Sequence, residues 1–302
     1  MLVDKLKKTF IYKWYKKWLH FHYQQRLRGR FVFENRRKDS LVGFFILAGY
    51  KQYVWSIVFE RVRQFVPQDI DICIVSSGVY NKELSDIAQR NGWSYVSTRK
   101  NKLTLAMNIA IHQFPQAEYI YKMDEDIFIT KNFYPDMLKK LRQFEDDKLQ
   151  YRPCMVAPLL LINGFGYSYL LKKMNLEEEY TKRFGKPLVL AGSDQAIEIN
   201  PEVAKFMWGE GGFMPHIDDI DDRLSHNEDE IHPCPIRFSI GAILFPRKTW
   251  EDMGYFESKG SSILRRTTIR STSFFISSGS FHVPKPGSRS SPMMKPGLPV
   301  MS

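Results

Sequence analysis

The stretch AEYIYKMDEDIFIT, residues 117–130, places three acidic residues in a row between two apolar runs. The first apolar run has the length and composition of a buried strand. Unpaired carboxylates at the end of such a strand are costly, so Asp124, Glu125 and Asp126 are expected to meet something positive. The sequence around them indicates where in the fold they stand.

Strand-like and helix-like stretches alternate ahead of this segment. Strands are predicted at 41–50, 71–78, 93–98 and 117–130, with helices at 52–66, 81–92 and 102–114 between them. This alternation predicts an α/β fold with a mostly parallel sheet flanked by helices on both faces. Such sheets bind ligands beyond the carboxyl ends of their strands.

Position in the sheet separates the acidic pairs of this chain. An Asp-x-Asp occurs by chance about once in a chain of this length, so the spacing alone indicates little. Asp69 and Asp71 lie at the amino end of their predicted strand, whereas Asp124 and Asp126 follow the first apolar run of theirs, at the ligand-binding end. A third pair lies in HIDDIDDRLSHNEDE, residues 216–230, which is expected to be a polar loop with a solvated acidic surface.

The two aspartates after the predicted strand suit a divalent cation. Side chains alternate along an extended backbone, so Asp124 and Asp126 are expected on one face and Glu125 on the other. Two carboxylates form a partial shell for Mg²⁺ or Mn²⁺, which leaves other positions for water and substrate phosphates. A bound diphosphate would then neutralise the remaining charge. The alternative is an exposed acidic turn or a helix cap.

In this setting, residues 41–134 resemble the nucleotide-binding half of a GT-A fold glycosyltransferase, particularly of the family 2 group, and MDED is similar to the Asp-x-Asp motif of that family. Enzymes of this group pass a sugar from a nucleoside diphosphate sugar to an acceptor hydroxyl. The resemblance implies a Rossmann-like GT-A sheet and a Mn²⁺ or Mg²⁺ cofactor. It implies that Asp126 binds this metal directly and that Asp124 reaches the ribose or a metal-bound water.

Two further stretches resemble the donor site of the family: LAGYK, residues 47–51, and NKLTLAMNIAI, residues 101–111. The first is similar to the loop beside the base, and the second to a segment that ends in Asn near the start of a helix. At the end of the second strand Ser77 stands where many relatives have an acidic residue, so the base stays open, and a simple turn is the alternative. The donor-binding residues implied are Ala48, Tyr50, Ser77, Lys102, Asn108 and Asp124.

RFSIGAILFPRKTWEDMGYFE, residues 237–257, resembles the acceptor-side strand and helix of the family. This implies that Gly241, Trp250 and Phe256 line the acceptor pocket, although Trp250 suits the core equally well. The segment ahead of this stretch matches only loosely. It offers Asp194 as an acceptor-binding group, with a surface polar side chain as the alternative.

The activity implied is an inverting, metal-dependent transfer of a hexosyl or related group in the synthesis of a cell-surface polysaccharide, with a lipid-linked or polysaccharide acceptor. In the family the general base is usually an Asp or Glu at the start of a helix shortly after the acceptor-side stretch at 237–257. No Asp or Glu follows Glu257, so the general base is unknown. One alternative is therefore a catalytically impaired remnant that binds nucleotide sugar or a partner without turnover. A metal-dependent nucleotidyltransferase would need a Gly-rich basic loop after the first strand, and AGYKQY is a poor one.

Composition divides the chain into three parts: a basic amphipathic helix and linker at 1–39, the glycosyltransferase domain at 40–257, and a tail at 258–302. Within the domain, residues 40–135 are expected to bind the nucleotide sugar and residues 136–257 to form the acceptor side. The tail holds seven Lys and Arg and no acidic residue, and it is expected to be irregular, aberrant or disordered, as a shifted reading frame would leave it.

Basic charge lies at the two ends of the chain, since the net charge of +11 leaves the central segment net acidic. A nucleic-acid enzyme would carry basic surface on its folded body, so nucleic acid is not expected as a partner. The three cysteines lack metal-type or disulfide-type spacing, which suits a reducing cytoplasm. The apolar run at 41–49 is too short to span a bilayer.

Residues 2–24 combine aromatic side chains at helical spacing with flanking lysines. Their aromatic face could pack on the domain or a partner. The favoured interpretation is that it settles into the headgroup region of a membrane while the lysines meet anionic lipid. The second alternative predicts a peripheral protein at the inner face of the membrane. The aromatic residues concerned are Phe10, Trp14, Trp18 and Phe21.

Overall fold

The computed structural model describes residues 10–146, 154–160, 164–188, 196–225, 231–234, 240–257 and 273–282. The strands are β1 (Phe31–Glu34), β2 (Val42–Leu47), β3 (Asp71–Ser77), β4 (Ser94–Thr98), β5 (Tyr119–Asp124), β6 (Ile127–Phe128), β7 (Val156–Leu160), β8 (Ile231–Cys234), β9 (Ala242–Pro246) and β10 (Ser273–His282). The helices are α2 (Phe10–Gln25), α3 (Gln52–Phe65), α4 (Lys82–Arg90), α5 (Leu103–His112), α6 (Phe133–Asp146), α7 (Gly164–Lys173), α8 (Glu177–Phe184), α9 (Ala196–Ile199), α10 (Pro201–Trp208), α11 (Ile217–Ser225) and α12 (Arg247–Asp252).

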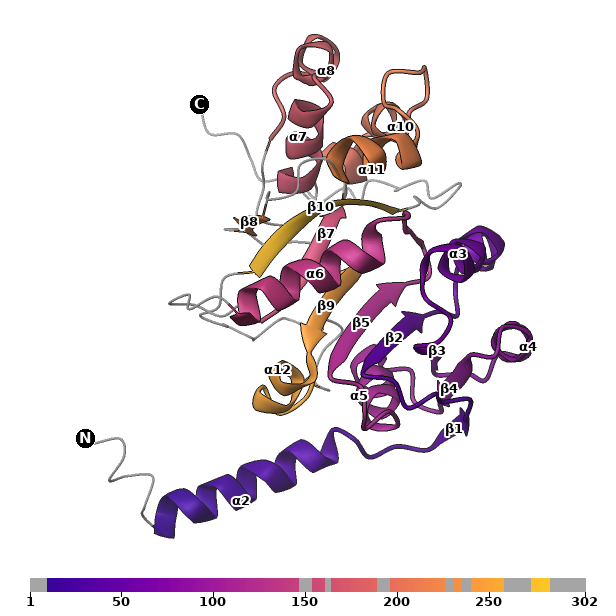
Figure 1. Ribbon diagram of the computed structural model, residues 1–302, viewed down its shortest axis with the longest axis vertical. Helices are drawn as coiled ribbons and strands as arrows, with labels where there is room; N and C mark the ends of the chain where they lie inside the picture. Colours follow the sequence, from indigo (N-terminus) through magenta and orange to yellow (C-terminus); the bar gives the residue numbers. More distant parts are fainter. Residues whose placement is uncertain are drawn as a thin grey trace, which may run out of the picture.

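One central sheet runs through the molecule, with helices on both of its faces (Figure 1). Its strand order is β1-β4-β3-β2-β5-β9-β7-β10-β6, and β8 pairs with β10. The four strands β4, β3, β2 and β5 are neighbours and parallel, and α3, α4 and α5 connect them in turn. The predicted α/β fold with a mostly parallel, helix-flanked sheet is confirmed. These four strands end at one edge of the sheet, which is the edge expected to bind ligands.

The central strand β2 is buried on both faces. Phe44 and Ile46 pack with α3, α4 and α6 on one face, whereas Phe45 and Leu47 pack with α5 and α12 on the other. A strand covered on both sides reads as a continuous apolar run rather than an alternating one. This explains why the uninterrupted stretch at 42–47 lies at the centre of the fold.

The second half of the chain adds antiparallel strands and a separate helical cluster. β9 runs antiparallel to β5, and β7 lies beside β9. Helices α7, α8, α10 and α11 pack around an apolar core of their own. The prediction of a polar loop at 216–230 is wrong for Ile217–Ser225, which form α11. Ile220 and Leu224 supply the buried face of this helix. Asp221 is buried as well and accepts hydrogen bonds from the backbone and side-chain nitrogens of Asn132, at 3.1 and 3.0 Å.

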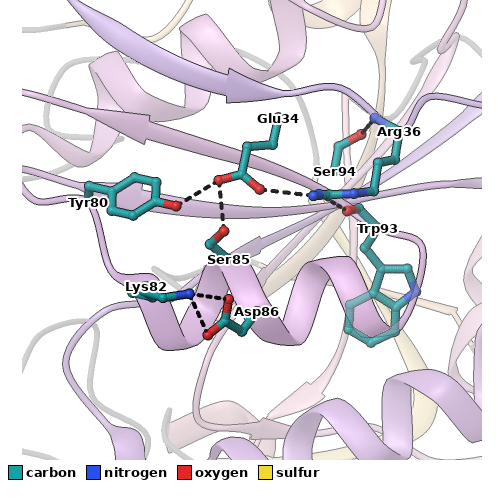
Figure 2. Close-up of polar contacts among 8 residues, drawn as sticks. All are labelled: Glu34, Arg36, Tyr80, Lys82, Ser85, Asp86, Trp93 and Ser94. Carbon is teal, nitrogen blue, oxygen red and sulfur yellow. Dashed lines mark hydrogen bonds and ion pairs between the residues drawn. The ribbon is translucent and has the colours of Figure 1, made fainter.

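Strand β1 pairs antiparallel with β4, within a stretch that the sequence analysis treats as a linker. Figure 2 shows the polar contacts that hold its end. The Glu34 carboxylate accepts hydrogen bonds from the hydroxyls of Tyr80, at 2.9 Å, and Ser85, at 2.7 Å. Arg36 pairs with the same carboxylate at 3.0 Å and donates to the carbonyl of Trp93 at 2.9 Å. The segment after α2 is therefore part of the folded domain.

The carboxyl end of α2 lies against the turn that follows α12. Arg26 donates to the carbonyls of Gly254, at 2.7 Å, and Tyr255, at 3.1 Å. A Cβ at Gly254 would lie 2.0 Å from the ring of Tyr23, so this glycine is what permits the contact. Within the described ranges, no helix is both long enough and apolar enough to cross a bilayer. The aromatic side chains of α2 on the amino-terminal side of this contact are exposed, at 61% for Trp14, 45% for Trp18 and 57% for Phe21.

Strand β10 comes from the tail. It runs parallel to β7 and antiparallel to β8 and β6. The sequence analysis did not predict this strand. The rest of the tail, at 258–272 and 283–302, lies outside the described residues.

Candidate functional site

A cavity of about 430 Å³ opens where the parallel strands end. Its wall comes from the end of β2 and the loop after it, from β3, from the loop ahead of α5, and from the end of β5. The lining residues are Leu47, Ala48, Tyr50, Lys51, Val75, Asn101, Leu103, Asp124, Glu125 and Asp126. Asp124, Glu125 and Asp126 thus lie at the edge of the sheet that is expected to bind ligands.

Three of the predicted donor-binding residues, Ala48, Tyr50 and Asp124, meet in this cavity with Asp126, the predicted metal ligand. Two loops bring them together, because β2 and β5 are neighbouring parallel strands and their carboxyl ends lie side by side. Leu47 at the end of β2 is opposite Asp124 in the register. This geometry places apolar and acidic groups in a single cavity.

Glu125 joins these two loops. Its buried carboxylate accepts hydrogen bonds from the backbone nitrogens of Gly49, at 2.8 Å, and Tyr50, at 3.0 Å, and from the indole nitrogen of Trp55, at 2.5 Å. The expected positive partner of Glu125 is therefore replaced by three neutral N–H donors. The chain turns at residues 125–126, so the alternation expected of an extended strand holds only as far as Asp124.

Each of the two aspartates has a lysine of its own. Asp126, whose side chain is 3% exposed, forms an ion pair with Lys51 from the loop after β2. Asp124 is 39% exposed and pairs with Lys122 at 2.6 Å. With Glu125, three carboxylates face two ammonium groups, which leaves one negative charge on this part of the cavity wall.

Gly241 lies beside the acidic turn. Its carbonyl accepts a hydrogen bond from the backbone nitrogen of Asp124 at 2.7 Å. This contact follows from the antiparallel pairing of β5 with β9, which begins one residue later. The segment predicted to bind the acceptor therefore touches the segment predicted to bind the donor.

The structure corrects the assignment of Asn108, Trp250 and Phe256 to binding pockets. All three are buried on the α5 and α12 face of the sheet. The Asn108 side-chain oxygen accepts from the Trp250 indole nitrogen at 2.9 Å and from the Phe256 backbone nitrogen at 3.0 Å. Its nitrogen donates to the carbonyls of Phe256, at 2.9 Å, and Arg26, at 3.2 Å. A buried amide whose bonds are all made within the protein has none left for a ligand.

Of the remaining predicted residues, Ser77 and Lys102 do not line the cavity. Ser77 is buried, and its carbonyl accepts from the Tyr50 hydroxyl at 3.3 Å. Lys102 is exposed at the amino end of α5, between two residues that do line the cavity. Asp194 lies outside the described residues.

Six cavity residues were not predicted as site residues, and three of them are exposed or half-buried: Lys51, Asn101 and Leu103. The sequence held a signal for Lys51. This lysine ends the LAGYK stretch, and the three acidic residues at 124–126 were expected to meet a positive group. Asn101 and Leu103 flank Lys102 at the start of α5. The sequence alone does not indicate which of these neighbouring side chains lines the cavity.

Asp124 and Asp126 are the residues that would hold a divalent cation. Among the described residues, no group of three or more His, Cys, Asp or Glu side chains is placed to hold a metal ion. Mg²⁺ is commonly bound through one or two carboxylates together with waters and substrate phosphates, so two carboxylates fit that chemistry. The ammonium of Lys51, which already lies against Asp126, marks this carboxylate as a position for a cation.

Comparisons with known proteins give remote structural matches. No family model and no curated protein sequence matches the chain. A mannosyltransferase, PcManGT from Pyrobaculum calidifontis in complex with GDP-Man and Mn²⁺, is 12% identical with a TM-score of 0.46, over 89% of this chain and 64% of that one. S. aureus TarS 1-349 is 9% identical with a TM-score of 0.41, over 78% of this chain and 60% of that one. The chain thus spans less than two thirds of the length of either structure, and at these scores its activity has to be argued from the site.

Proposed function

We propose that the protein is a glycosyltransferase, which moves a sugar from a nucleoside diphosphate sugar to an acceptor hydroxyl. The observation that carries the proposal is the composition of the cavity at the ends of β2 and β5. Tyr50 and Leu103 line it and are 63% and 43% exposed, which suits stacking against a base. Asp124, Asp126 and Lys51 line the same cavity and suit a diphosphate with its counter-ion.

The proposed reaction requires a bound acceptor hydroxyl, a base that takes its proton, and positive groups that stabilise the departing diphosphate. The acceptor oxygen attacks the anomeric carbon as the bond from that carbon to the diphosphate breaks, and the acceptor proton passes to a base. Attack from the opposite side inverts the configuration. Negative charge grows on the departing diphosphate, and positive groups fixed in a cavity stabilise it. When bound at Asp124 and Asp126, Mn²⁺ or Mg²⁺ would supply further positive charge to the diphosphate oxygens.

A second candidate is a remnant that binds nucleotide sugar without turnover. One observation favours it: the sequence contains no Asp or Glu after Glu257. Glu257 itself is 47% exposed and lies 3.8 Å from the guanidinium of Arg26, at the α2 junction and away from the cavity. The general base is therefore unassigned.

The decisive experiment is a binding and turnover screen of nucleotide sugars with and without Mn²⁺, on the wild type and on Asp126→Asn. Asp219→Asn is the matched control, because it changes an exposed aspartate of another Asp-x-Asp pair on α11. Turnover that is lost in Asp126→Asn and kept in the control supports the enzyme. Metal-dependent binding without turnover supports the remnant. If no nucleotide sugar binds to the wild type, both proposals fail.

We further propose that α2 seats the protein on an anionic membrane surface at the cytoplasmic face, where it acts on a lipid-linked or polysaccharide acceptor. The exposed side chains of Trp14, Trp18 and Phe21 suit the headgroup region. Each neighbouring lysine, such as the exposed Lys17, adds about 1 kcal/mol near anionic lipid.

Sedimentation with vesicles tests the membrane proposal. Binding is expected with phosphatidylserine in the vesicles, and it should weaken at high salt because the lysine contribution is screened. The triple variant Trp14→Ala, Trp18→Ala, Phe21→Ala should lose it. Ile199→Ala removes a side chain that is 58% exposed elsewhere and should bind as the wild type does. Equal binding by all three proteins would contradict the proposal.

A further inference from the structure

Two lysines face the acidic turn, and their surroundings differ. The Lys122 side chain is 2% exposed and donates to the carbonyl of Ile240 at 2.6 Å in addition to its contact with Asp124. The Lys51 side chain is 21% exposed, and Lys51 lines the cavity. Lys122 is therefore fixed within the protein, whereas Lys51 can reach a molecule that enters the cavity.

The Lys51 ammonium also occupies a carboxylate that a divalent cation would need. Asp126 is 3% exposed, so little solvent is available to replace a missing counter-ion. Removing the charged partner of a buried carboxylate is unfavourable. A cation beside Asp126 is therefore favoured, and either the ammonium or a metal ion can serve.

We propose that Lys51 is a positioning residue with two partners. It neutralises Asp126 in the empty site, and it moves to the diphosphate of the donor when a divalent cation takes its place at Asp126. This inference rests on the proposed function, because it assigns Lys51 a role toward the same donor. Metal alone must break the ion pair of Lys51 with Asp126, whereas metal and diphosphate together replace it by an ion pair of Lys51 with the diphosphate.

The exchange makes metal and diphosphate bind cooperatively, and the coupling must be reciprocal. Lys51→Met keeps the length and apolar character of the side chain and removes the charge. It should bind Mn²⁺ alone about tenfold more tightly than the wild type, because the competing ammonium is gone. It should bind UDP or GDP about tenfold more weakly in the presence of Mn²⁺, because the diphosphate has lost a partner.

The test measures Mn²⁺ binding by electron paramagnetic resonance and UDP and GDP binding by calorimetry, each as a function of the other. Lys248→Met is the matched control, because Lys248 is 80% exposed and pairs with Asp252 on α12, away from the cavity. Circular dichroism checks folding. Lys51→Gln, which also removes the charge, serves if the methionine variant does not fold, and it should change both affinities in the same directions.

Opposite changes in the two affinities support the proposal. Mn²⁺ binding to Lys51→Met that is unchanged or weaker overturns the competition, and unchanged nucleotide binding overturns the move to the diphosphate. If the wild type binds neither UDP, GDP nor any other nucleoside diphosphate, the proposed function fails. The Mn²⁺ titration then still reports separately whether Lys51 and a metal compete for Asp126.

Discussion

The Glu125 carboxylate offers the sharpest test of how the site is built. It is buried and accepts from three N–H donors, those of Gly49, Tyr50 and Trp55. Glu125→Gln keeps the shape of the side chain and replaces one acceptor oxygen by an NH₂ group. With the amide oxygen toward Gly49 and Trp55, the NH₂ faces the N–H of Tyr50, which keeps only its longer contact of 3.2 Å to that oxygen. In the reverse orientation Gly49 and Trp55 face the NH₂ instead.

The cost follows from these contacts. The Tyr50 N–H loses the shorter of its two contacts, at about 1–2 kcal/mol, and two hydrogen bonds to a charged oxygen become bonds to a neutral one, at roughly 0.5–1 kcal/mol each. The expected loss in the free energy of unfolding is about 3 kcal/mol. This is a large part of the stability of an ordinary domain, which is about 5–15 kcal/mol.

Equilibrium urea denaturation measures this loss, and hydrogen exchange of the backbone amides at 49–50 reports it locally. The control is Glu60→Gln on α3, whose exposed carboxylate pairs with Arg63 and whose loss should change stability by less than about 0.5 kcal/mol. The reasoning is refuted if the two variants lose equal stability, or if exchange at Gly49 and Tyr50 does not accelerate in Glu125→Gln.

Three further changes probe the rest of the frame. Asn108→Leu should lower the free energy of unfolding by about 3 kcal/mol, measured in urea, because it leaves the Trp250 indole without an acceptor. Gly254→Ala should release α2 from the domain, measured by limited proteolysis, because φ is +70° there and a Cβ would meet the Tyr23 ring at 2.0 Å. Burial alone would raise the pKa of Glu34, but hydrogen bonds to its carboxylate outweigh it and place the pKa below 4.5. The stability that Glu34 contributes is thus present above pH 4.5 and lost as pH falls through the lowered pKa, so Glu34→Gln should flatten the loss of stability in urea between pH 5 and pH 3.

Each of these changes has a contrary outcome. An Asn108→Leu protein as stable as the wild type would mean that the buried amide contributes nothing. Gly92→Ala is the control for Gly254→Ala, because Gly92 has φ +67° with open space around it, so the two share backbone strain and differ in the clash with Tyr23. Equal proteolysis of the two glycine variants would contradict the seating of α2. Parallel pH profiles for wild type and Glu34→Gln would remove the role of that carboxylate.

The parallel half of the fold could be predicted from the sequence because local pattern and tertiary environment agree there. β2 is buried on both faces and reads as an unbroken apolar run. The edge strands could not be predicted in the same way. The β1 residues are exposed or half-buried, and their strand forms because β4 offers a free edge, which no local pattern records. The same holds for β10, whose partners β7 and β8 come from earlier in the chain.

The candidate site could be predicted in part, for a different reason. Residues at the ends of parallel strands, such as Ala48 and Asp124, are placed by topology, and topology was predictable. Asn108 is the one polar residue in the stretch 105–111 of α5, which is otherwise apolar and is buried throughout. From sequence alone, a buried amide that satisfies its own protein looks the same as one that faces a ligand. The partners that decide between the two, Trp250 and Phe256, lie more than 140 residues away in the chain.

The seat of α2 has a consequence for reach. The turn at Gly254 follows α12 and β9, and the register pairs Pro246 with Tyr119, where β5 begins (Figure 1). The cavity lies where β5 ends, and six residues of strand measure about 20 Å. With α2 lying on lipid, as proposed, the reaction would take place one strand length above the bilayer. An acceptor would have to hold its hydroxyl at that height, which suits the growing tip of a long glycan better than the first sugar on a lipid.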